Sequence, residues 1–240
     1  MKLSIIMPVY NEKRYFKTII ERILEVKLPI EREIIIIESN STDGTKEIVK
    51  EYRNHKDIKI FYQKRPQGKG SAVKLGIKRS SGEIILIQDA DLEYDPKDYI
   101  KLIEPILKKE YKFVIGSRKM GQNTWAIRNM ETNIGIAIFI NIIANLADAF
   151  FNIIYNVRLT DPQSMYKVFL RDCLKGIKFE SNYFNLDWEI VAKFIRKGYI
   201  PLELPIHYES RGFHDGKKVR FLRDIYLNVY AIFKYRFVKL

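Results

Sequence analysis

Two aspartates spaced one residue apart follow the apolar run Ile84–Ile87 of this 240-residue chain. An unbroken run of isoleucine and leucine predicts a strand buried on both faces, so Asp89 and Asp91 are expected to emerge together at its carboxyl end. Open α/β sheets bind their ligands at that edge. Two carboxylates there suit a hard divalent cation such as Mg²⁺ or Mn²⁺, which screens the phosphates of a nucleotide.

The same two aspartates also fit a structural interpretation. They could cap a helix in a surface loop, with Asp95 and Pro96 beginning that helix. An Asp-x-Asp pair is too short to decide between the two interpretations, so the decision depends on the elements around it.

Short apolar runs alternate with amphipathic stretches in the first half of the chain. The pattern predicts strands at 3–8, 33–38, 58–62, 83–89 and 113–117, and helices at 13–26, 44–53, 68–80 and 97–108. Such alternation indicates right-handed βαβ units. The expected fold is therefore α/β, with a mostly parallel central sheet flanked by helices.

Two further polar clusters follow predicted strands. Pro8, Tyr10 and Glu12 come at the end of the first strand, and a polar run at 38–45 follows the second. Because the carboxyl ends of parallel strands share one edge of a sheet, we expect these clusters to meet the two aspartates in one crevice.

The composition is that of a globular protein, since 47% of the residues are hydrophobic and 30% are charged. We expect one domain over 1–240, with a first half (1–118), a second half (119–218) and a C-terminal helix (219–240). The single cysteine, Cys173, gives no internal disulfide and favours a cytoplasmic setting. The first residues meet a charge and a proline too early to predict a signal peptide.

The formal net charge of +13 predicts an anionic partner. Acidic lipid, phosphorylated small molecules and nucleic acid all meet this requirement. The aromatic residues do not interleave with the basic ones and the sequence shows no nucleic-acid-binding motif, so we expect no nucleic acid partner.

Two segments predict amphipathic helices. Residues 132–147 carry no charge, but this run is shorter than the roughly twenty residues that span a bilayer. A polar stripe at helical spacing comprises Asn141, Asn145, Asp148, Asn152 and Asn156. The wide apolar remainder fits packing against the sheet or another subunit, or a position in a membrane interface. Segment 219–240 combines aromatic and basic residues, which suits an anionic membrane surface or ordinary core packing. Any membrane contact is expected to be peripheral.

The order and spacing of five motifs resemble the inverting glycosyltransferases of family 2, which have the type A glycosyltransferase fold. These motifs are PVYNE at 8–12, STDGT at 41–45, GKGSAVKLGI at 68–77, QDADLEYDP at 88–96 and GSR at 116–118. The later segment, Tyr208-x-x-Arg211 followed by Gly216-Lys217-Lys218-Val219, is similar to the branch of polyprenyl-phosphate sugar transferases.

The resemblance implies a site for a nucleoside diphosphate sugar. Pro8, Tyr10 and Glu12 are implied at the base and ribose, and a ribose diol suits the two acceptor oxygens of Glu12. After the second strand the family has a pair of aspartates and a glycine, whereas this chain has Glu38 and Ser39. Both are expected in the base pocket, but the departure leaves the identity of the base open.

The resemblance also implies the metal and phosphate ligands. Asp89 and Asp91 are expected to hold the metal and the sugar, with Ala90 between them in the donor site and Glu93 as a further candidate ligand. A bound metal would stabilise the departing diphosphate. The cations available for the donor or for an acceptor phosphate are Lys69, Arg118, Arg128, Arg211, Lys217 and Lys218.

Asp187 stands where many family members have the base that deprotonates a hydroxyl acceptor. It could equally cap the helix that begins there. A phosphate acceptor is already an anion and needs no strong base, in which case Asp187 only positions it. The predicted catalytic residues are thus Asp91, Asp187 and Arg211, and the loop 212–216 is a candidate lid.

Together these features predict a metal-dependent transferase that moves a sugar from a UDP- or GDP-sugar to a polyprenyl (dolichyl or undecaprenyl) phosphate at the cytoplasmic face of a membrane. A second hypothesis is transfer to a glycan or small-molecule hydroxyl with Asp187 as base. A third is a catalytically silent module that binds nucleotide sugars or membranes. The expected cofactor is Mn²⁺ or Mg²⁺.

Overall fold

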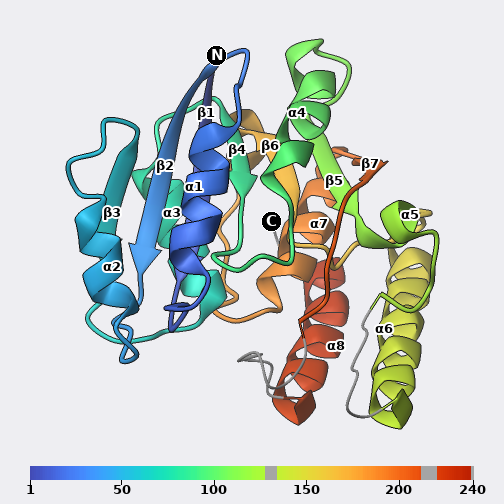
Figure 1. Cartoon of the computed structure of the whole chain (residues 1–240). Coiled ribbons are helices and arrows are strands. Elements are labelled where there is room, and N and C mark those ends of the chain that lie inside the picture. The colour runs from blue at the N-terminus through green and yellow to red at the C-terminus, as the bar shows by residue number, and fades with distance from the viewer. Residues whose placement is uncertain (128–133, 212–220, 239–240) are drawn as a thin grey trace.

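The computed structural model describes residues 1–127, 134–211 and 221–238 (Figure 1). The strands are β1 (Lys2–Val9), β2 (Glu31–Glu38), β3 (Ile58–Tyr62), β4 (Ile84–Ile87), β5 (Phe113–Ser117), β6 (Lys167–Leu170) and β7 (Leu202–Pro205). The α-helices are α1 (Phe16–Glu25), α2 (Thr45–Glu51), α3 (Lys69–Arg79), α4 (Tyr99–Leu107), α5 (Arg118–Gln122), α6 (Ile134–Tyr155), α7 (Leu186–Arg196) and α8 (Phe221–Phe237). Short 3₁₀ turns cover Pro96–Asp98 and Arg171–Leu174.

These strands form one sheet in the order β3-β2-β1-β4-β6-β5-β7. The pairs β2-β3, β1-β2, β1-β4 and β5-β7 are parallel, and β6 runs antiparallel to both of its neighbours. The prediction of an α/β fold with a mostly parallel sheet is confirmed. Because β1 lies between β2 and β4, the strand order reverses there, and the carboxyl ends of β1 and β4 form the topological switch point where such sheets bind ligands.

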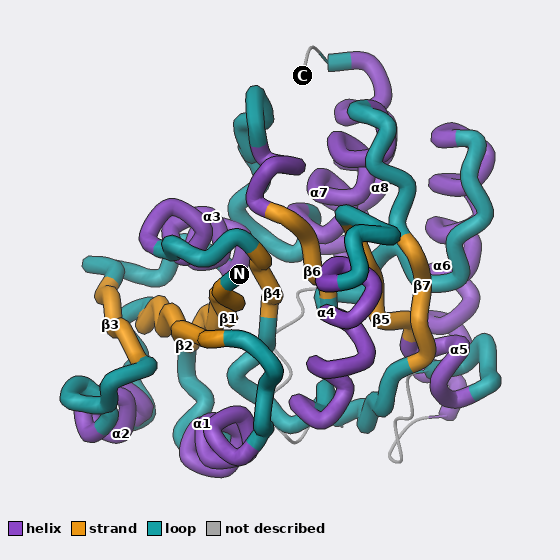
Figure 2. The backbone as a smooth tube through the Cα atoms, turned by 90° about the horizontal axis from the view of Figure 1, so that it is seen from above, coloured by secondary structure: helices purple, strands orange, loops and turns teal. Residues whose placement is uncertain are grey.

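Helices cover both faces of this sheet (Figure 2). Residues 34–37 of β2 and 84–87 of β4 are all buried, as their unbroken apolar runs predicted. Successive side chains of β1 enter two different cores, because side chains alternate along a strand. Ile5 packs in the core that holds residues of α1 and α4, and Ile6 packs in the core that holds residues of α3 and α7.

Two strands were not predicted. Strand β6 has four residues and begins with Lys167, whose fully buried ammonium group donates to the carbonyl groups of Pro162 and Ser164. Strand β7 also has four residues and ends in Pro205. Neither segment is long enough to show a period, and a lysine in a buried strand contradicts the apolar pattern used to find the others.

Two predicted helices begin later than expected. The first starts at Phe16 because Asn11 adopts a left-handed φ of 50° and the carbonyl of Glu12 closes a turn by accepting the N–H groups of Tyr15 and Phe16. The one expected at 97–108 opens as a 3₁₀ turn, in which Asp95 accepts a hydrogen bond from the main chain of Lys97, and continues as α4.

Helix α6 has its polar side turned inward. Asp148 is only 4% exposed and forms an ion pair of 2.5 Å with Lys119 of α5. The same carboxylate accepts a hydrogen bond of 3.0 Å from Gln163, and Lys119 also donates to Asn145. Burial raises the pKa of Asp148 to about 7 in spite of Lys119. The polar stripe predicted from the sequence is therefore the side that fastens α6 to the protein.

The opposite side of α6 is apolar and exposed. Ile142, Leu146 and Ile153 are 44%, 64% and 78% exposed. By length and composition alone, Ala137–Tyr155 could cross a membrane, with a mean hydropathy of 1.8. Helix α6 extends beyond the uncharged run to Tyr155, and the charge of Asp148 within it is buried against Lys119.

Burial predicts how two phenylalanines differ in their contribution to stability. Phe194 is fully buried and meets the rings of Phe113 and Phe169 at centroid distances of 5.0 Å, whereas Phe237 is 79% exposed. Phe194→Ala should lower the free energy of unfolding by about 3–5 kcal/mol. Phe237→Ala, which removes the same atoms, should change it by less than about 0.5 kcal/mol. Urea unfolding followed by circular dichroism measures both, and equal losses would show that the assigned core is wrong.

Candidate active site

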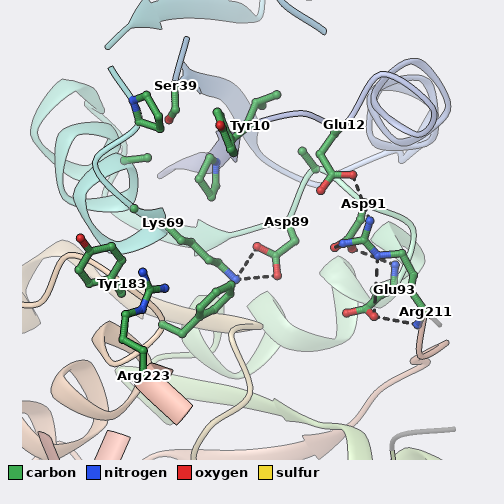
Figure 3. A pocket seen from close by; sticks show the side chains of 17 residues that line it. Tyr10, Glu12, Ser39, Lys69, Asp89, Asp91, Glu93, Tyr183, Arg211 and Arg223 are labelled. Carbon is green, nitrogen blue, oxygen red and sulfur yellow. Dashed lines mark hydrogen bonds and ion pairs between the residues drawn. The ribbon is translucent and has the colours of Figure 1, made fainter. Parts of the chain in front are cut away.

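A cavity of about 420 Å³ opens at the carboxyl ends of β1 and β4 (Figure 3). It lies at the topological switch point, where the fold is expected to bind a ligand. The residues lining it are Pro8, Val9, Tyr10, Glu12, Ser39, Pro66, Gly68, Lys69, Ala72, Asp89, Ala90, Asp91, Glu93, Tyr183, Phe184, Arg211 and Arg223. The predicted convergence of the three polar clusters on one crevice is therefore observed.

The turns after β1 and β2 are fastened to each other. The main-chain N–H of Asn11 donates to Ser41 Oγ at 2.9 Å, and that of Glu12 donates to Thr45 Oγ1 at 2.8 Å. These bonds connect two turns that lie thirty or more residues apart in the chain. They fix the positions of Glu12 and Tyr10 at the rim of the cavity.

Lys69 reaches across the cavity from the first turn of α3 to Asp89. Its ammonium nitrogen lies 2.6 Å from Asp89 Oδ1 and 2.8 Å from Oδ2. The adjacent Gly70 allows this helix end to approach the chain at 181–183, because a Cβ there would lie 2.8 Å from main-chain atoms of Ser181, Asn182 and Tyr183. That close approach brings the aromatic side chain of Tyr183 into the cavity wall.

Arg211 gathers three carboxylates on the other side of the cavity. Its guanidinium lies 3.1 Å from Glu12 Oε2, 2.5 Å from Asp91 Oδ2 and 3.8 Å from Glu93 Oε1. The main-chain N–H of Arg211 donates to Glu93 at 2.8 Å as well. Desolvation, and then the nearby charges of Asp89 and Glu93, raise the pKa of Asp91 to about 7.

The structure separates the two interpretations of the acidic motif. Asp95 is the residue that caps the following turn, through its bond to the main chain of Lys97. Asp91 accepts one local hydrogen bond from Glu93, but its other oxygen and both oxygens of Asp89 meet cationic side chains in the cavity. Asp89 and Asp91 therefore line the cavity instead of capping the helix.

The carboxylates of the cavity fit a hard divalent cation. In the described ranges of the chain, no group of three or more His, Cys, Asp or Glu side chains is arranged to hold a metal ion. Four carboxylates of the cavity share the charges of Lys69 and Arg211, which leaves negative charge for a further cation to neutralise. Carboxylate oxygens are the ligands that Mg²⁺ and Mn²⁺ prefer. Asp89 and Asp91 would hold such an ion, with Glu93 beside them.

Comparison with known proteins shows which family the chain belongs to. The family described as glycosyl transferase family 2 matches residues 4–182. The chain belongs to glycosyl transferase family 2. It is 28% identical to a dolichol-phosphate mannosyltransferase of Pyrococcus furiosus over 94% of this chain and 63% of that protein. It is 27% identical to a dodecaprenyl-phosphate galacturonate synthase of Rhizobium johnstonii over 55% of this chain and 40% of that protein. The chain spans less than two thirds of the length of these curated relatives.

Solved structures of glycosyltransferases share the fold. Glucosyl-3-phosphoglycerate synthase from Mycobacterium tuberculosis, in complex with Mn²⁺, UDP and phosphoglyceric acid, superposes with a TM-score of 0.72 at 16% identity, covering 100% of this chain and 80% of that one. Mannosyltransferase PcManGT from Pyrobaculum calidifontis, in complex with GDP-Man and Mn²⁺, gives 0.58 at 19% identity, covering 85% and 54%. The predicted type A glycosyltransferase fold is confirmed, and the prediction of a glycosyltransferase is confirmed at the level of the family.

Most of the family 2 residues predicted for the donor do line the cavity. They are Pro8, Tyr10, Glu12, Ser39, Lys69, Asp89, Ala90, Asp91, Glu93 and Arg211. Among the described residues, the exceptions are Glu38 and Arg118. Glu38 is fully buried and accepts hydrogen bonds from the main chains of Asn40 and Ser41, so it shapes the turn after β2. Arg118 is held by two hydrogen bonds of 2.7 Å to the buried Asp161.

Asp187 lies in the first turn of α7 and is not one of the residues that line the cavity. It is 8% exposed, and its Oδ1 atom has no hydrogen-bond partner among the described residues. Burial raises its pKa, and the positive charges of Lys167 and Lys69 oppose that rise. A buried carboxylate with an unpaired oxygen is a group with capacity to accept a proton or a hydrogen bond from a ligand.

Three predicted residues, Arg128, Lys217 and Lys218, lie outside the described residues, as does the loop 212–216. Conversely, the cavity contains side chains that the sequence analysis did not assign to it. Tyr183 and Phe184 lie just before Asp187, which was considered for catalysis, and Arg223 was assigned only to a basic helix. The centroid of the Tyr183 ring lies 4.4 Å from the Arg223 guanidinium carbon. No short sequence motif predicts this contact.

The role of Asp91 predicts a pH-dependent affinity. Asp91→Asn keeps the shape of the side chain and removes its charge, so binding of UDP or GDP in the presence of Mn²⁺ should weaken by about tenfold or more, which is about 1.4 kcal/mol. Because a metal ligand must be deprotonated and the pKa of Asp91 is about 7, wild-type affinity should rise between about pH 6 and about pH 8.

Isothermal titration calorimetry at several pH values measures this affinity. Asp95→Asn is the matched control, because it makes the same chemical change at a capping residue that does not line the cavity. If the two variants bind alike, Asp91 has no part in holding the nucleotide and metal.

Proposed function

We propose that this family 2 chain transfers a sugar from a nucleoside diphosphate sugar to a polyprenyl phosphate at a membrane surface. The observation that carries the proposal is the cavity in which Asp89 and Asp91 lie beside Glu12, Lys69 and Arg211. It combines acidic groups for a metal with basic groups for phosphates at the ligand-binding edge of the sheet. The relatives named for dolichol phosphate and dodecaprenyl phosphate support the acceptor class.

The donor would lie along the ends of β1, β2 and β4. Pro8, Tyr10 and Ser39 form the part of the cavity assigned to the base, and Glu12 offers its carboxylate to the ribose hydroxyl groups. Lys69 stands beside Asp89, where its positive charge would face the diphosphate. UDP and GDP appear in the names of structures with the same fold, so both are candidate nucleotides.

The reaction would be an in-line displacement at the anomeric carbon. An oxygen of the acceptor phosphate forms the new bond to that carbon, while the bond to the diphosphate oxygen breaks and its electron pair leaves with the diphosphate. Lys69 and Arg211 are cations positioned to stabilise the developing negative charge. A divalent cation held by Asp89 and Asp91 would supply further stabilisation of the same leaving group. Asp187 then positions the acceptor, because a phosphate anion has no proton to remove.

An exposed apolar face supports a membrane acceptor. The face is formed by Ile142, Leu146 and Ile153 of α6 together with Tyr226, Tyr230 and Phe233 of α8. The two helices lie side by side (Figure 1), with the rings of Phe150 and Phe233 4.8 Å apart. Basic residues of α8 accompany the face, and the chain carries a net charge of +13. Apolar and aromatic side chains with flanking positive charge suit an anionic bilayer.

The membrane contact is tested with vesicles of phosphatidylglycerol and phosphatidylcholine. The double substitution Leu146→Glu and Ile153→Glu should reduce co-sedimentation about tenfold or more, because it places two carboxylates on the buried side of the contact. Ile100→Glu is the control, since Ile100 is 46% exposed on α4, away from this face. Equal binding by all three proteins would contradict the proposal, as would a dimer that the double substitution dissociates in sedimentation velocity.

Transfer itself is tested with labelled UDP- and GDP-sugars, Mn²⁺ and a polyprenyl phosphate. Label should move into the organic phase as a lipid-linked sugar. Asp187→Asn should retain kcat within about threefold if the acceptor is a phosphate, whereas loss of a required general base costs about 100-fold or more. Nucleotide binding and Tm of this variant serve as controls for its folding.

The second candidate, transfer to a hydroxyl group, is favoured by one observation, the unpaired oxygen of the buried Asp187. A hundredfold loss of kcat in Asp187→Asn with a glycan or small alcohol as acceptor would support it. The third candidate, a catalytically silent module, predicts that no donor is transferred or hydrolysed with any acceptor.

A further inference from the structure

Arg211 binds the very carboxylates that the metal and the donor need. Its guanidinium contacts Asp91 at 2.5 Å and Glu12 at 3.1 Å, with Glu93 at 3.8 Å. Asp91 and Glu93 follow β4, Glu12 follows β1, and Arg211 arrives from the segment beyond β7. Figure 3 shows these three carboxylates around one guanidinium at one end of the cavity.

This contact is more than a surface ion pair. Arg211 is 14% exposed at its side chain, and the chain leading to it is tied to the same region. The hydroxyl group of Tyr208 donates to Glu93 Oε2 at 3.2 Å, and the main chain of Glu209 donates to the carbonyl of Glu93 at 2.9 Å. Tyr94 and Tyr208 also form an isolated antiparallel β-bridge. The guanidinium is therefore held in place before any ligand arrives.

A metal ion on Asp91 would compete with Arg211 for the negative charge of the same carboxylate. Mg²⁺ sits at about 2.0–2.1 Å from its ligands. The guanidinium nitrogen already lies 2.5 Å from Asp91 Oδ2, so an ion on that oxygen would be repelled by a positive charge close to it. Asp89 differs, because its cation, Lys69, comes from α3 and forms no ion pair with a second carboxylate of the described residues.

We propose that Arg211 is an internal substitute for the metal. Arg211 leaves Asp91 when the metal and the nucleoside diphosphate bind together. The inference rests on the proposed function, since it assigns a regulation of the same donor site. Before binding, Arg211 pairs with Glu12, Asp91 and Glu93 and offsets part of their negative charge. After the metal has replaced Arg211 at Asp91, the guanidinium pairs with the incoming diphosphate instead of the carboxylates. The metal alone brings no such partner, so it displaces Arg211 poorly.

The test measures Mn²⁺ affinity by electron paramagnetic resonance of the free ion, without nucleotide and with UDP or GDP. Arg211→Gln should bind Mn²⁺ alone on the order of tenfold more tightly than the wild type. The same variant should gain less from added nucleotide, because the diphosphate loses a cationic partner. Arg211→Lys, which keeps the charge but not the fork that bridges two carboxylates, should fall between them.

Arg79→Gln is the matched control, because it removes one positive charge from the exposed face of α3. An equal rise in Mn²⁺ affinity in Arg79→Gln would show that overall charge explains the effect and would overturn the proposal. Unchanged affinity in Arg211→Gln, in protein whose circular dichroism matches the wild type, would overturn it too.

A stability measurement covers the case in which Arg211→Gln folds poorly. Removing the guanidinium leaves three carboxylates to repel one another, so Mn²⁺ alone should raise Tm of the variant more than that of the wild type. No difference in this increase contradicts the exchange. Wild-type binding of Mn²⁺ with nucleotide reports on the proposed function, whereas the change with Mn²⁺ alone reports on Arg211, so the two failures are distinguishable.

Discussion

Mutual repulsion among carboxylates at the ends of β1 and β4 is the constraint on which the site depends. The two strands pair directly, with Ile6 opposite Ile87, so the polar residues that follow them emerge at the same edge. Partly buried carboxylates are costly unless cations accompany them. Lys69 supplies one cation from α3 and Arg211 supplies the other from beyond β7. The second half of the chain is therefore joined to the first through the functional groups themselves.

The sequence predicted the positions of strand ends better than the partners of side chains. Unbroken isoleucine runs located β2 and β4, and their ends located Ser39, Asp89 and Asp91. The pairing of Arg211 with Asp91 spans 120 residues, and no local spacing encodes it. Arg118 shows the same limit, because its place in a motif gave no sign that Asp161 binds it. Periodicity reports which face a side chain takes, whereas the choice among charged partners is made in three dimensions.

The sequence pattern of α6 was identified correctly but fitted two orientations of the helix. Its polar stripe was recognised from spacing, but spacing cannot say whether a stripe faces water or the protein. Lys119 and Gln163 decide the matter by offering hydrogen-bond partners to Asp148. A polar group loses little on burial when such partners meet it, so the apolar side is left outward. An amphipathic helix usually turns its apolar side inward, whereas α6 turns its polar side inward because that side carries its contacts to the protein.

Helix α8 takes part in both the cavity and the apolar face. Arg223 near its beginning enters the cavity wall, while Tyr226, Tyr230 and Phe233 further along are exposed. A helix of 17 residues is a stiff rod roughly 25 Å long, from a rise of 1.5 Å per residue. A tilt of this rod against whatever it rests on would shift Arg223 and the neighbouring Tyr183 as well. One rigid element thus carries both a side chain of the pocket and the exposed aromatic side chains.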